Sequence, residues 1–105
     1  MMNFKRIFLI ICFLPFVSAE IVIDVRTPVE WSEGHLQSAD NIEWQNILSI
    51  KESISKNEKI YLYCRSGNRS GKATKILIDA GYTNVTNAGS ISQAGELLDL
   101  KIVKK

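Results

Sequence analysis

Two short apolar runs, residues 21–25 (IVIDV) and 59–63 (KIYLY), constrain the fold of this chain more than any other feature. Runs of this length that are rich in β-branched and aromatic residues are typical of strands buried inside a parallel sheet. A pattern typical of a helix follows each run, and strands that alternate with helices through short connections become parallel neighbours. We therefore predict an α/β fold, in which helices flank a small parallel sheet of about four to five strands.

The helix expected after the first run has clear start and stop signals. Thr27 is a suitable N-cap, Pro28 occupies the first helical position, and Glu30 lies three residues after the cap. This spacing is a capping box, in which the cap and the glutamate each satisfy a backbone amide at the start of the helix. Gly34 is expected to end this helix, and residues 39–42 are expected to form a brief strand.

The rest of the chain carries weaker patterns. The apolar spacing over residues 43–55 indicates a helix, and another is expected from Ser70 to a stop at Gly81. The C-terminal part is expected to contain a short strand at Val85, a loop at 87–90 and a weak helix within 95–105.

The N-terminal segment is predicted to be a secretory signal peptide rather than part of the fold. Lys5 and Arg6 precede an uncharged run at 7–17, which is followed by small residues at the −3 and −1 positions of a cleavage site. The run is too short for a membrane-spanning helix, which needs about 20 apolar residues. The expected division is a signal peptide at 1–19 and a domain at 20–105, with a periplasmic location. An uncleaved anchor is the alternative.

Removing this segment changes the charge and the cysteine count of the chain. The 13 basic residues include Lys5 and Arg6, so the remaining basic residues equal the 11 acidic ones and the domain is formally neutral. This balance favours neither nucleic acid nor a membrane surface as a partner, and we expect no stable membrane association after cleavage. Cys12 is also removed, which leaves Cys64 as a lone thiol. In an oxidising compartment, such a thiol indicates an intermolecular pair or a reactive group.

Cys64 directly follows the second apolar run and begins the sequence CRSGNRS. If a helix starts at Ser70, the unpaired amides of its first turn surround the cysteine, and the helix dipole adds positive potential. Gly67 and Gly71 allow the backbone to curl into an anion-binding nest. A sulfur in such a nest is stabilised as the thiolate, so we expect a lowered pKa for Cys64. The loop is predicted to hold a sulfur anion or an oxyanion.

Three other uses of such a loop fit the residues poorly. A nucleotide P-loop has four residues between its glycines and a hydroxyl residue after its lysine, whereas here only three residues separate Gly67 from Gly71 and Ala73 follows the lysine. Cysteine phosphatases place five residues between cysteine and arginine, and only four separate Cys64 from Arg69. A redox Cys-x-x-Cys pair is excluded because the second position is glycine. The shorter loop favours sulfur carried on the cysteine itself.

Residues 64–70 resemble the active-site loop of single-domain rhodaneses, a family of sulfurtransferases. A second signature of that family is similar to residues 23–26, Glu30-Trp31 and Gly34-His35-Leu36 near the start of the domain. The similarity continues through Asn41-Ile42, Gly81-Tyr82 and Asn87-Ala88-Gly89. It therefore covers most of residues 20–105 in order, and it implies a rhodanese-like sheet.

The resemblance implies transfer of sulfane sulfur from thiosulfate to a thiophilic acceptor, cyanide or a thiol, through a persulfide on Cys64. A protein thiol is a possible acceptor, and no cofactor or metal is implied. The residues implied to bind substrate are Arg65, Ser66, Gly67, Asn68, Arg69 and Ser70. Their amides would stabilise the persulfide, and the two arginines would hold the sulfonate end of thiosulfate. The alternatives are a non-catalytic binding or sensing module and a periplasmic sulfur carrier.

Two segments depart from the family's usual pattern, and several polar residues are expected to be structural. Ser38-Ala39-Asp40 stands where the family usually has Gly-Ala, and Ser90-Ile91 stands where many members have a second glycine and a tryptophan. Residues expected to fix the structure rather than react are His35, Asp24, Arg26, Trp31 and Trp44.

Overall fold

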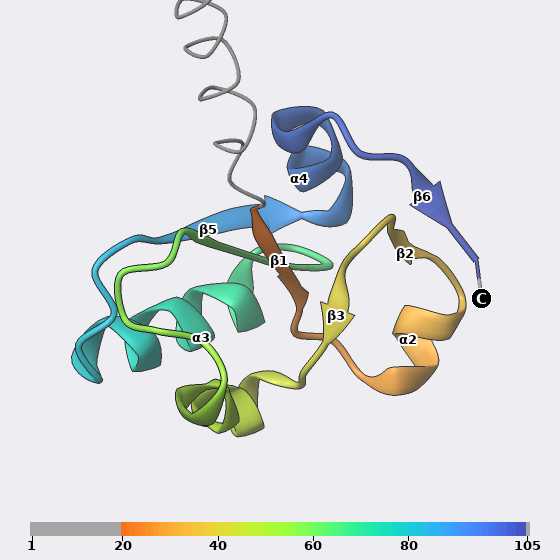
Figure 1. The fold of residues 1–105 in the computed structure, drawn as a ribbon. Coiled ribbons are helices and arrows are strands. Elements are labelled where there is room, and N and C mark those ends of the chain that lie inside the picture. The colour runs from red at the N-terminus through yellow and green to blue at the C-terminus, as the bar shows by residue number, and fades with distance from the viewer. Residues whose placement is uncertain (1–19, 105) are drawn as a thin grey trace, which may run out of the picture.

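A computed structural model describes residues 20–104 of the chain, so the predicted signal peptide at 1–19 lies outside the described residues. The main element is a four-stranded sheet in the order β3-β1-β4-β5, in which every neighbouring pair is parallel (Figure 1). The strands are β1 (Ile21–Asp24), β3 (Asp40–Asn41), β4 (Ile60–Cys64) and β5 (Val85–Ser90). The predicted parallel α/β sheet is therefore present, and both apolar runs form its central strands.

The other described elements are four helical segments and a small antiparallel pair of strands, β2 and β6, beside the main sheet (Figure 1). Their bounds are α2 (Pro28–Ser32), β2 (His35–Leu36), the 3₁₀ helix η2 (Trp44–Glu52), α3 (Asn68–Asp79), α4 (Ile91–Leu98) and β6 (Ile102–Val103). None of the helices between residues 20 and 104 combines the length and the apolar character that crossing a bilayer would require.

Both faces of the sheet are covered, which explains why the central strands lack a regular alternation of apolar and polar residues. Figure 1 shows α3 and η2 on one side of the sheet and α4 on the other. Along β1, Ile23 packs into the core beneath α3 and η2, while Val22 packs into the smaller core beneath α4. Successive strand residues point to opposite faces, so one short strand supplies both cores.

Helix α2 begins with the predicted capping box. The amide of Glu30 donates to Thr27 Oγ1 over 3.2 Å, and the amide of Thr27 donates to Glu30 Oε1 over 3.0 Å. Pro28 is at the first helical position, as predicted. The box fixes the position of the Glu30 carboxylate, which contacts the residues that follow Cys64.

Two predicted boundaries around the sheet were wrong. Helix α3 begins at Asn68 rather than Ser70, because Gly67 takes the N-cap position with a left-handed φ of 97°. Residues 87–90, predicted as a loop, belong to β5 and pair with the end of β4. Their small and polar composition gave no strand signal, and the pairing depends on the neighbouring strand rather than on local preference.

The C-terminal helix was predicted with the wrong bounds, because α4 spans Ile91–Leu98 and only its last part falls within 95–105. Helix α4 lies earlier and opens with a capping box in which Ser90 Oγ accepts from the Gln93 amide over 3.1 Å. It ends at Asp99, which adopts a left-handed φ of 58°, and the chain then continues into β6. The helix predicted over 43–55 is present as η2, although with 3₁₀ rather than α geometry.

Candidate active site

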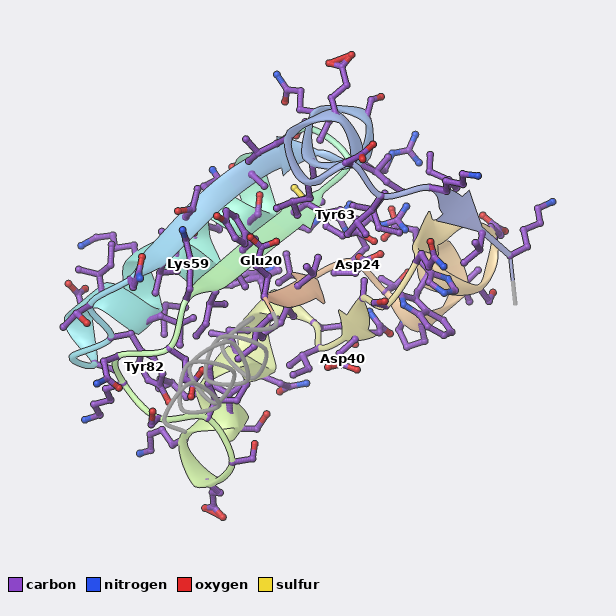
Figure 2. The ribbon with its side chains drawn as sticks, turned by 45° about the horizontal axis from the view of Figure 1, so that its top comes forward. Glu20, Asp24, Asp40, Lys59, Tyr63 and Tyr82 are labelled. Atoms are coloured by element: carbon purple, nitrogen blue, oxygen red, sulfur yellow. The ribbon has the colours of Figure 1, made fainter. Side chains whose placement is uncertain are left out.

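Cys64 is the last residue of β4, so its side chain lies at the carboxyl edge of the parallel sheet, where α/β proteins usually place their ligands. Figure 2 shows Tyr63 near Asp24, and these two residues are register partners at the ends of β4 and β1. The segment from Cys64 to the first turn of α3, residues 64–70, is called the thiol loop below. Cys64 is buried, with 1% of its surface exposed.

The thiol loop directs backbone and hydroxyl groups at the Cys64 sulfur. The amide of Gly67 donates to Sγ over 3.0 Å, and the amide of Ser70 lies 3.4 Å from it. The Ser70 hydroxyl is also 3.4 Å from Sγ. Burial by itself raises the pKa of the Cys64 thiol, but the hydroxyl and amide of Ser70 and the amides of Ser66 and Gly67 outweigh it, and the net pKa is lowered. The predicted anion nest is therefore present around the sulfur.

The nest requires glycine at position 67 for two reasons. Its φ of 97° is a conformation that residues with a side chain rarely adopt. A Cβ at this position would also lie 3.3 Å from Gly89 Cα in β5. The thiol loop is therefore pressed against β5, and this contact holds the Gly67 amide in place.

Behind the sulfur, Ser70 contacts a residue that the sequence analysis did not assign to the site. The Ser70 hydroxyl donates to Asn87 Oδ1 over 2.6 Å, and Asn87 Nδ2 donates to the Gly67 carbonyl over 3.1 Å. Asn87 escaped notice because it was placed in a loop. The only signal that could have revealed it was the family resemblance around it.

In front of the thiol loop, Glu30 contacts both predicted arginines. Arg69 Nη1 and Nη2 donate to the two carboxylate oxygens of Glu30 over 2.8 and 3.0 Å, and Arg65 Nη1 lies 3.9 Å from the same carboxylate. The Arg69 guanidinium, together with the amide and hydroxyl of Thr27, lowers the pKa of Glu30 to about 2. Glu30, Arg65 and Arg69 are called the charged bridge below, and their formal charges sum to +1.

The side chains of the charged bridge differ in exposure. The Arg65 side chain is 69% exposed, whereas Arg69 and Glu30 are 29% and 20% exposed. The proximity of Cys64 contributes to a raised pKa of Arg69, after the larger effect of Glu30, so the guanidinium and the thiol interact electrostatically. From the sequence, Glu30 was predicted only as part of a capping box. The capping pattern does not indicate that the same carboxylate also binds Arg69.

The remaining predicted binding residues contribute backbone rather than side chains. Ser66 and Asn68 bond to each other, with the Asn68 amide donating to Ser66 Oγ over 3.3 Å at the exposed side of the loop. The Ser66 amide acts on the sulfur, as described above. No described hydrogen bond within residues 20–104 joins either side chain to Sγ.

The residues expected to be structural have structural partners. Arg26 and Asp24 form a buried ion pair of 2.7 Å, and Arg26 also donates to the Gly34 carbonyl over 2.7 Å. The His35 ring stacks on Trp31 with centroids 3.7 Å apart, and its Nδ1 lies 2.9 Å from the Trp31 carbonyl. These contacts fasten α2 and β2 to the end of β1, and so they support the position of Glu30.

The two departures from the family pattern are accommodated in the backbone. Ser38 adopts a left-handed φ of 75°, the conformation that glycine would take without strain. Ser90 is the N-cap of α4 and occupies the register position opposite Cys64. Neither departure disrupts the sheet or the thiol loop.

Comparisons with known proteins show which sequences and folds this chain is similar to. The sequence model of a family described as "Rhodanese-like domain" matches residues 16–93. The chain is 41% identical over 83 residues to thiosulfate sulfurtransferase PspE of Escherichia coli K12, covering 74% of this chain and 77% of that protein. It is 35% identical over 75 residues to the chloroplastic thiosulfate sulfurtransferase 16 of Arabidopsis thaliana, covering 60% of this chain and 62% of that protein.

Among solved structures, a protein described as "rhodanese with anions from E. coli" superposes with a TM-score of 0.72 at 35% sequence identity. The match covers 83% of this chain and all of that one. The fold is therefore similar to that of a known protein over nearly the whole of the described region.

Proposed function

The chain belongs to the rhodanese family, and from that premise we propose that it is a thiosulfate sulfurtransferase that carries sulfane sulfur as a persulfide on Cys64. The observation that carries this proposal is the set of donors around the Cys64 sulfur, with the Gly67 amide at 3.0 Å. These donors favour the thiolate, which is the nucleophilic form of cysteine. The relatives whose names include thiosulfate sulfurtransferase support the choice of donor.

The reaction proceeds in two half-reactions. The Cys64 thiolate attacks the outer sulfur of thiosulfate, the sulfur–sulfur bond of thiosulfate breaks, and sulfite leaves with the bonding electron pair. The acceptor, cyanide or a thiol, then attacks the outer sulfur of the persulfide and regenerates the thiolate. This is covalent catalysis, and ping-pong kinetics are expected. The amides of Ser66, Gly67 and Ser70 stabilise the anionic sulfur throughout, in the manner of an oxyanion hole.

The arginines divide the work of binding the sulfonate end of the donor. Arg69 already gives two of its five donor positions to Glu30, so its charge is largely compensated. Arg65 is exposed, and its Nη1 lies 3.9 Å from the Glu30 carboxylate, farther than the nitrogens of Arg69. Its guanidinium is therefore available to an incoming anion. We therefore assign the main electrostatic attraction to Arg65, and a positioning contact to the remaining donors of Arg69.

The assay that tests this function uses the full chain with Cys12→Ser, so that Cys64 is its single thiol. Thiosulfate and cyanide are expected to yield thiocyanate, and an added Cys64→Ser substitution is expected to abolish it. Thiosulfate alone should raise the intact mass by one sulfur atom, and a dithiol should reverse this increase. If the Cys12→Ser protein forms thiocyanate no faster than the same protein with Cys64→Ser, the non-catalytic binding module becomes the better proposal.

The mass measurement also separates an enzyme from a sulfur carrier. A carrier that accepts sulfur only from a partner protein would keep its mass in thiosulfate, whereas the enzyme would gain one sulfur within a turnover. We propose a periplasmic location, with a small-molecule donor and with either a small thiol or a protein thiol as the acceptor. Secretion is tested by the N-terminal sequence of the protein recovered from cells, which is expected to begin at Glu20.

A further inference from the structure

One side chain of β5 holds the thiol loop at two points. Asn87 Oδ1 accepts from the Ser70 hydroxyl over 2.6 Å, and Asn87 Nδ2 donates to the Gly67 carbonyl over 3.1 Å. The same Oδ1 also accepts from the Gly89 amide over 3.0 Å. Ser70 and Gly67 both donate hydrogen bonds to the Cys64 sulfur through their backbone amides, and the Ser70 hydroxyl also lies within reach of it. Along both routes, one residue therefore separates Asn87 from the Cys64 sulfur.

The Ser70 hydroxyl has two acceptors within reach but only one hydrogen to give. Asn87 Oδ1 is at 2.6 Å and the Cys64 sulfur is at 3.4 Å. Ser70 is fully buried, so water cannot supply a second donor. At these distances the hydrogen points toward Asn87, and the hydroxyl oxygen is left to accept the proton of a neutral thiol.

We propose that Asn87 is a positioning residue for the Cys64 sulfur, and that it makes the Ser70 hydroxyl a switch between two hydrogen bonds. With a neutral thiol, Cys64 donates to Ser70 Oγ and Ser70 donates to Asn87 Oδ1. When the thiol loses its proton to solvent, the Ser70 hydroxyl turns and donates to the sulfur anion. Asn87 Oδ1 keeps the Gly89 amide as its donor, so neither position leaves it without a partner.

The switch opposes ionisation of the thiol to a defined extent. Asn87 stabilises the neutral state by accepting from Ser70, and that bond must be given up when the sulfur becomes anionic. Changing the strength of Asn87 as an acceptor should therefore change the thiol pKa in a predictable direction. The relevance of this control to sulfur transfer depends on the proposed function, but the control itself does not.

The charged groups near the sulfur come from elements other than β5. Arg69 in α3 interacts with Cys64, and it is itself acted on by Glu30 of α2 and Asp24 of β1. Asn87 is uncharged and reaches the sulfur only through Ser70 and Gly67. A double-mutant cycle with Ser70 can therefore isolate the proposed path.

The test measures the pH dependence of Cys64 alkylation in the full chain with Cys12→Ser. Asn87→Asp keeps the shape of the side chain and accepts more strongly, because hydrogen bonds to a carboxylate are stronger than those to an amide. Like Asn87→Ala, it loses the Nδ2 bond to the Gly67 carbonyl, so that loss is common to both variants. We expect the thiol pKa to rise by about one unit, which slows alkylation about tenfold at a pH well below the pKa. Asn87→Ala removes the competing acceptor, and a pKa about half a unit lower is expected.

Two controls decide whether the effect passes through the Ser70 hydroxyl. In a Ser70→Ala background, the shift caused by Asn87→Ala should shrink to the part that passes through Gly67, and that caused by Asn87→Asp should keep only this part and its through-space part. Asn84 lies three residues before Asn87, about 10 Å away along an extended chain, so Asn84→Asp adds the same charge farther from the sulfur. It should shift the thiol pKa by less than about a third as much as Asn87→Asp.

Shifts in opposite directions for Asp and Ala that become smaller without the Ser70 hydroxyl support the proposal. A rise in both variants means that Asn87 only braces the loop, and equal shifts with and without Ser70 mean a plain electrostatic effect; either result overturns the switch. Alkylation needs no sulfur donor, so the outcome is independent of the thiocyanate assay. A protein that shows the coupling but forms no thiocyanate would keep the switch and lose the proposed function.

Discussion

The thiol loop and the charged bridge share Arg65 and Arg69, yet they lower the pKa of an acid in different ways. In the thiol loop, the groups that lower the pKa of Cys64 are neutral amides and a hydroxyl, and they act against the effect of burial. In the charged bridge, the pKa of Glu30 is lowered to about 2 chiefly by the guanidinium of Arg69. The thiol loop uses the dipoles of amides and a hydroxyl, and the charged bridge uses the formal charges of side chains.

This difference separates the chemistry of the site from its selection of substrate. Backbone amides in a buried loop are already oriented, so they stabilise a sulfur anion with little reorganisation and little sensitivity to salt. Side-chain charges at a partly exposed edge are screened within about 8 Å at physiological ionic strength. We therefore expect the thiol loop to control reactivity and the charged bridge to control the affinity for anions.

Gly67→Ala is expected to produce the largest effect, because it displaces the amide nearest the sulfur. The new Cβ would occupy a backbone with φ of 97° and lie 3.3 Å from Gly89 Cα. Loss of one well-placed donor of this kind typically costs about 100-fold or more in turnover. Thiocyanate formation should fall by that factor, and the alkylation profile should move to a higher thiol pKa.

A matched control for this variant is Gly81→Ala at the other end of α3. Gly81 has a φ of 100°, so alanine meets a similar backbone penalty, but the atoms nearest its Cβ would belong to the flexible Lys56 side chain. The helix between the two glycines is about 18 Å long, which keeps this strain away from the sulfur. Gly81→Ala should lose stability and keep the thiol pKa. If both variants lose activity equally, general destabilisation explains the result and the role of the amide is disproved.

Glu30→Gln is expected to have a smaller effect, directed at binding rather than chemistry. Glutamine can still complete a capping box, so α2 should keep its start. The charge of the bridge rises from +1 to +2, and the KM for thiosulfate should fall about threefold at low salt, a factor that screening should reduce at about 1 M salt. Steady-state kinetics of both proteins at low and at high salt measure the change in KM under each condition.

Alkylation with a charged and an uncharged reagent gives a second test of the same substitution. Iodoacetate is an anion and iodoacetamide is neutral, so Glu30→Gln should speed the first reaction relative to the second. If Glu30→Gln leaves the ratio of the iodoacetate rate to the iodoacetamide rate unchanged, and if the KM for thiosulfate does not depend on salt, the charged bridge does not select for anions. Arg65→Gln provides the opposite change in charge, and its ratio should move in the other direction.

The sequence predicted the thiol loop much better than the charged bridge, and the reason is physical. The nest around Cys64 is formed by residues close in sequence, and a strand, a glycine and a helix start are local signals. The bond between Arg69 and Glu30 joins residues 39 positions apart, and no local pattern encodes such a contact. Each half was visible, Glu30 as a cap and Arg69 as a loop cation, but their pairing required the fold.

The errors in the predicted fold have the same origin. The strands at 21–25 and 59–63 were found because both faces are buried and the residues are apolar throughout. Residues 87–90 were missed because small and polar residues form a strand there only through pairing with β4. Asn87 was hidden by that error, since a strand residue facing Ser70 had been assigned to a loop.

The smallest expected effect concerns stability, and it distinguishes the two regions by their response to acid. A carboxylate whose pKa is lowered on folding contributes stability above its unfolded pKa, and this contribution is lost as the pH falls toward the folded pKa. For Glu30 the window extends from its ordinary value of 4.5 down to about 2. A partly exposed pair of this kind contributes about 1 kcal/mol at most.

Urea unfolding of the Cys12→Ser chain and its Glu30→Gln variant at pH 6 and pH 2.5 measures this contribution. The difference in unfolding free energy between the two proteins should be about 1 kcal/mol at pH 6 and should largely disappear at pH 2.5. Glu33→Gln, at the exposed C-cap of the same helix, removes a carboxylate outside the bridge and should show a smaller change. A difference that persists at pH 2.5 would mean that Glu30 stabilises the fold through its capping bonds rather than through Arg69. Glu30 would then serve mainly to start helix α2, and the affinity of the site for anions would have to come from Arg65 and Arg69 alone.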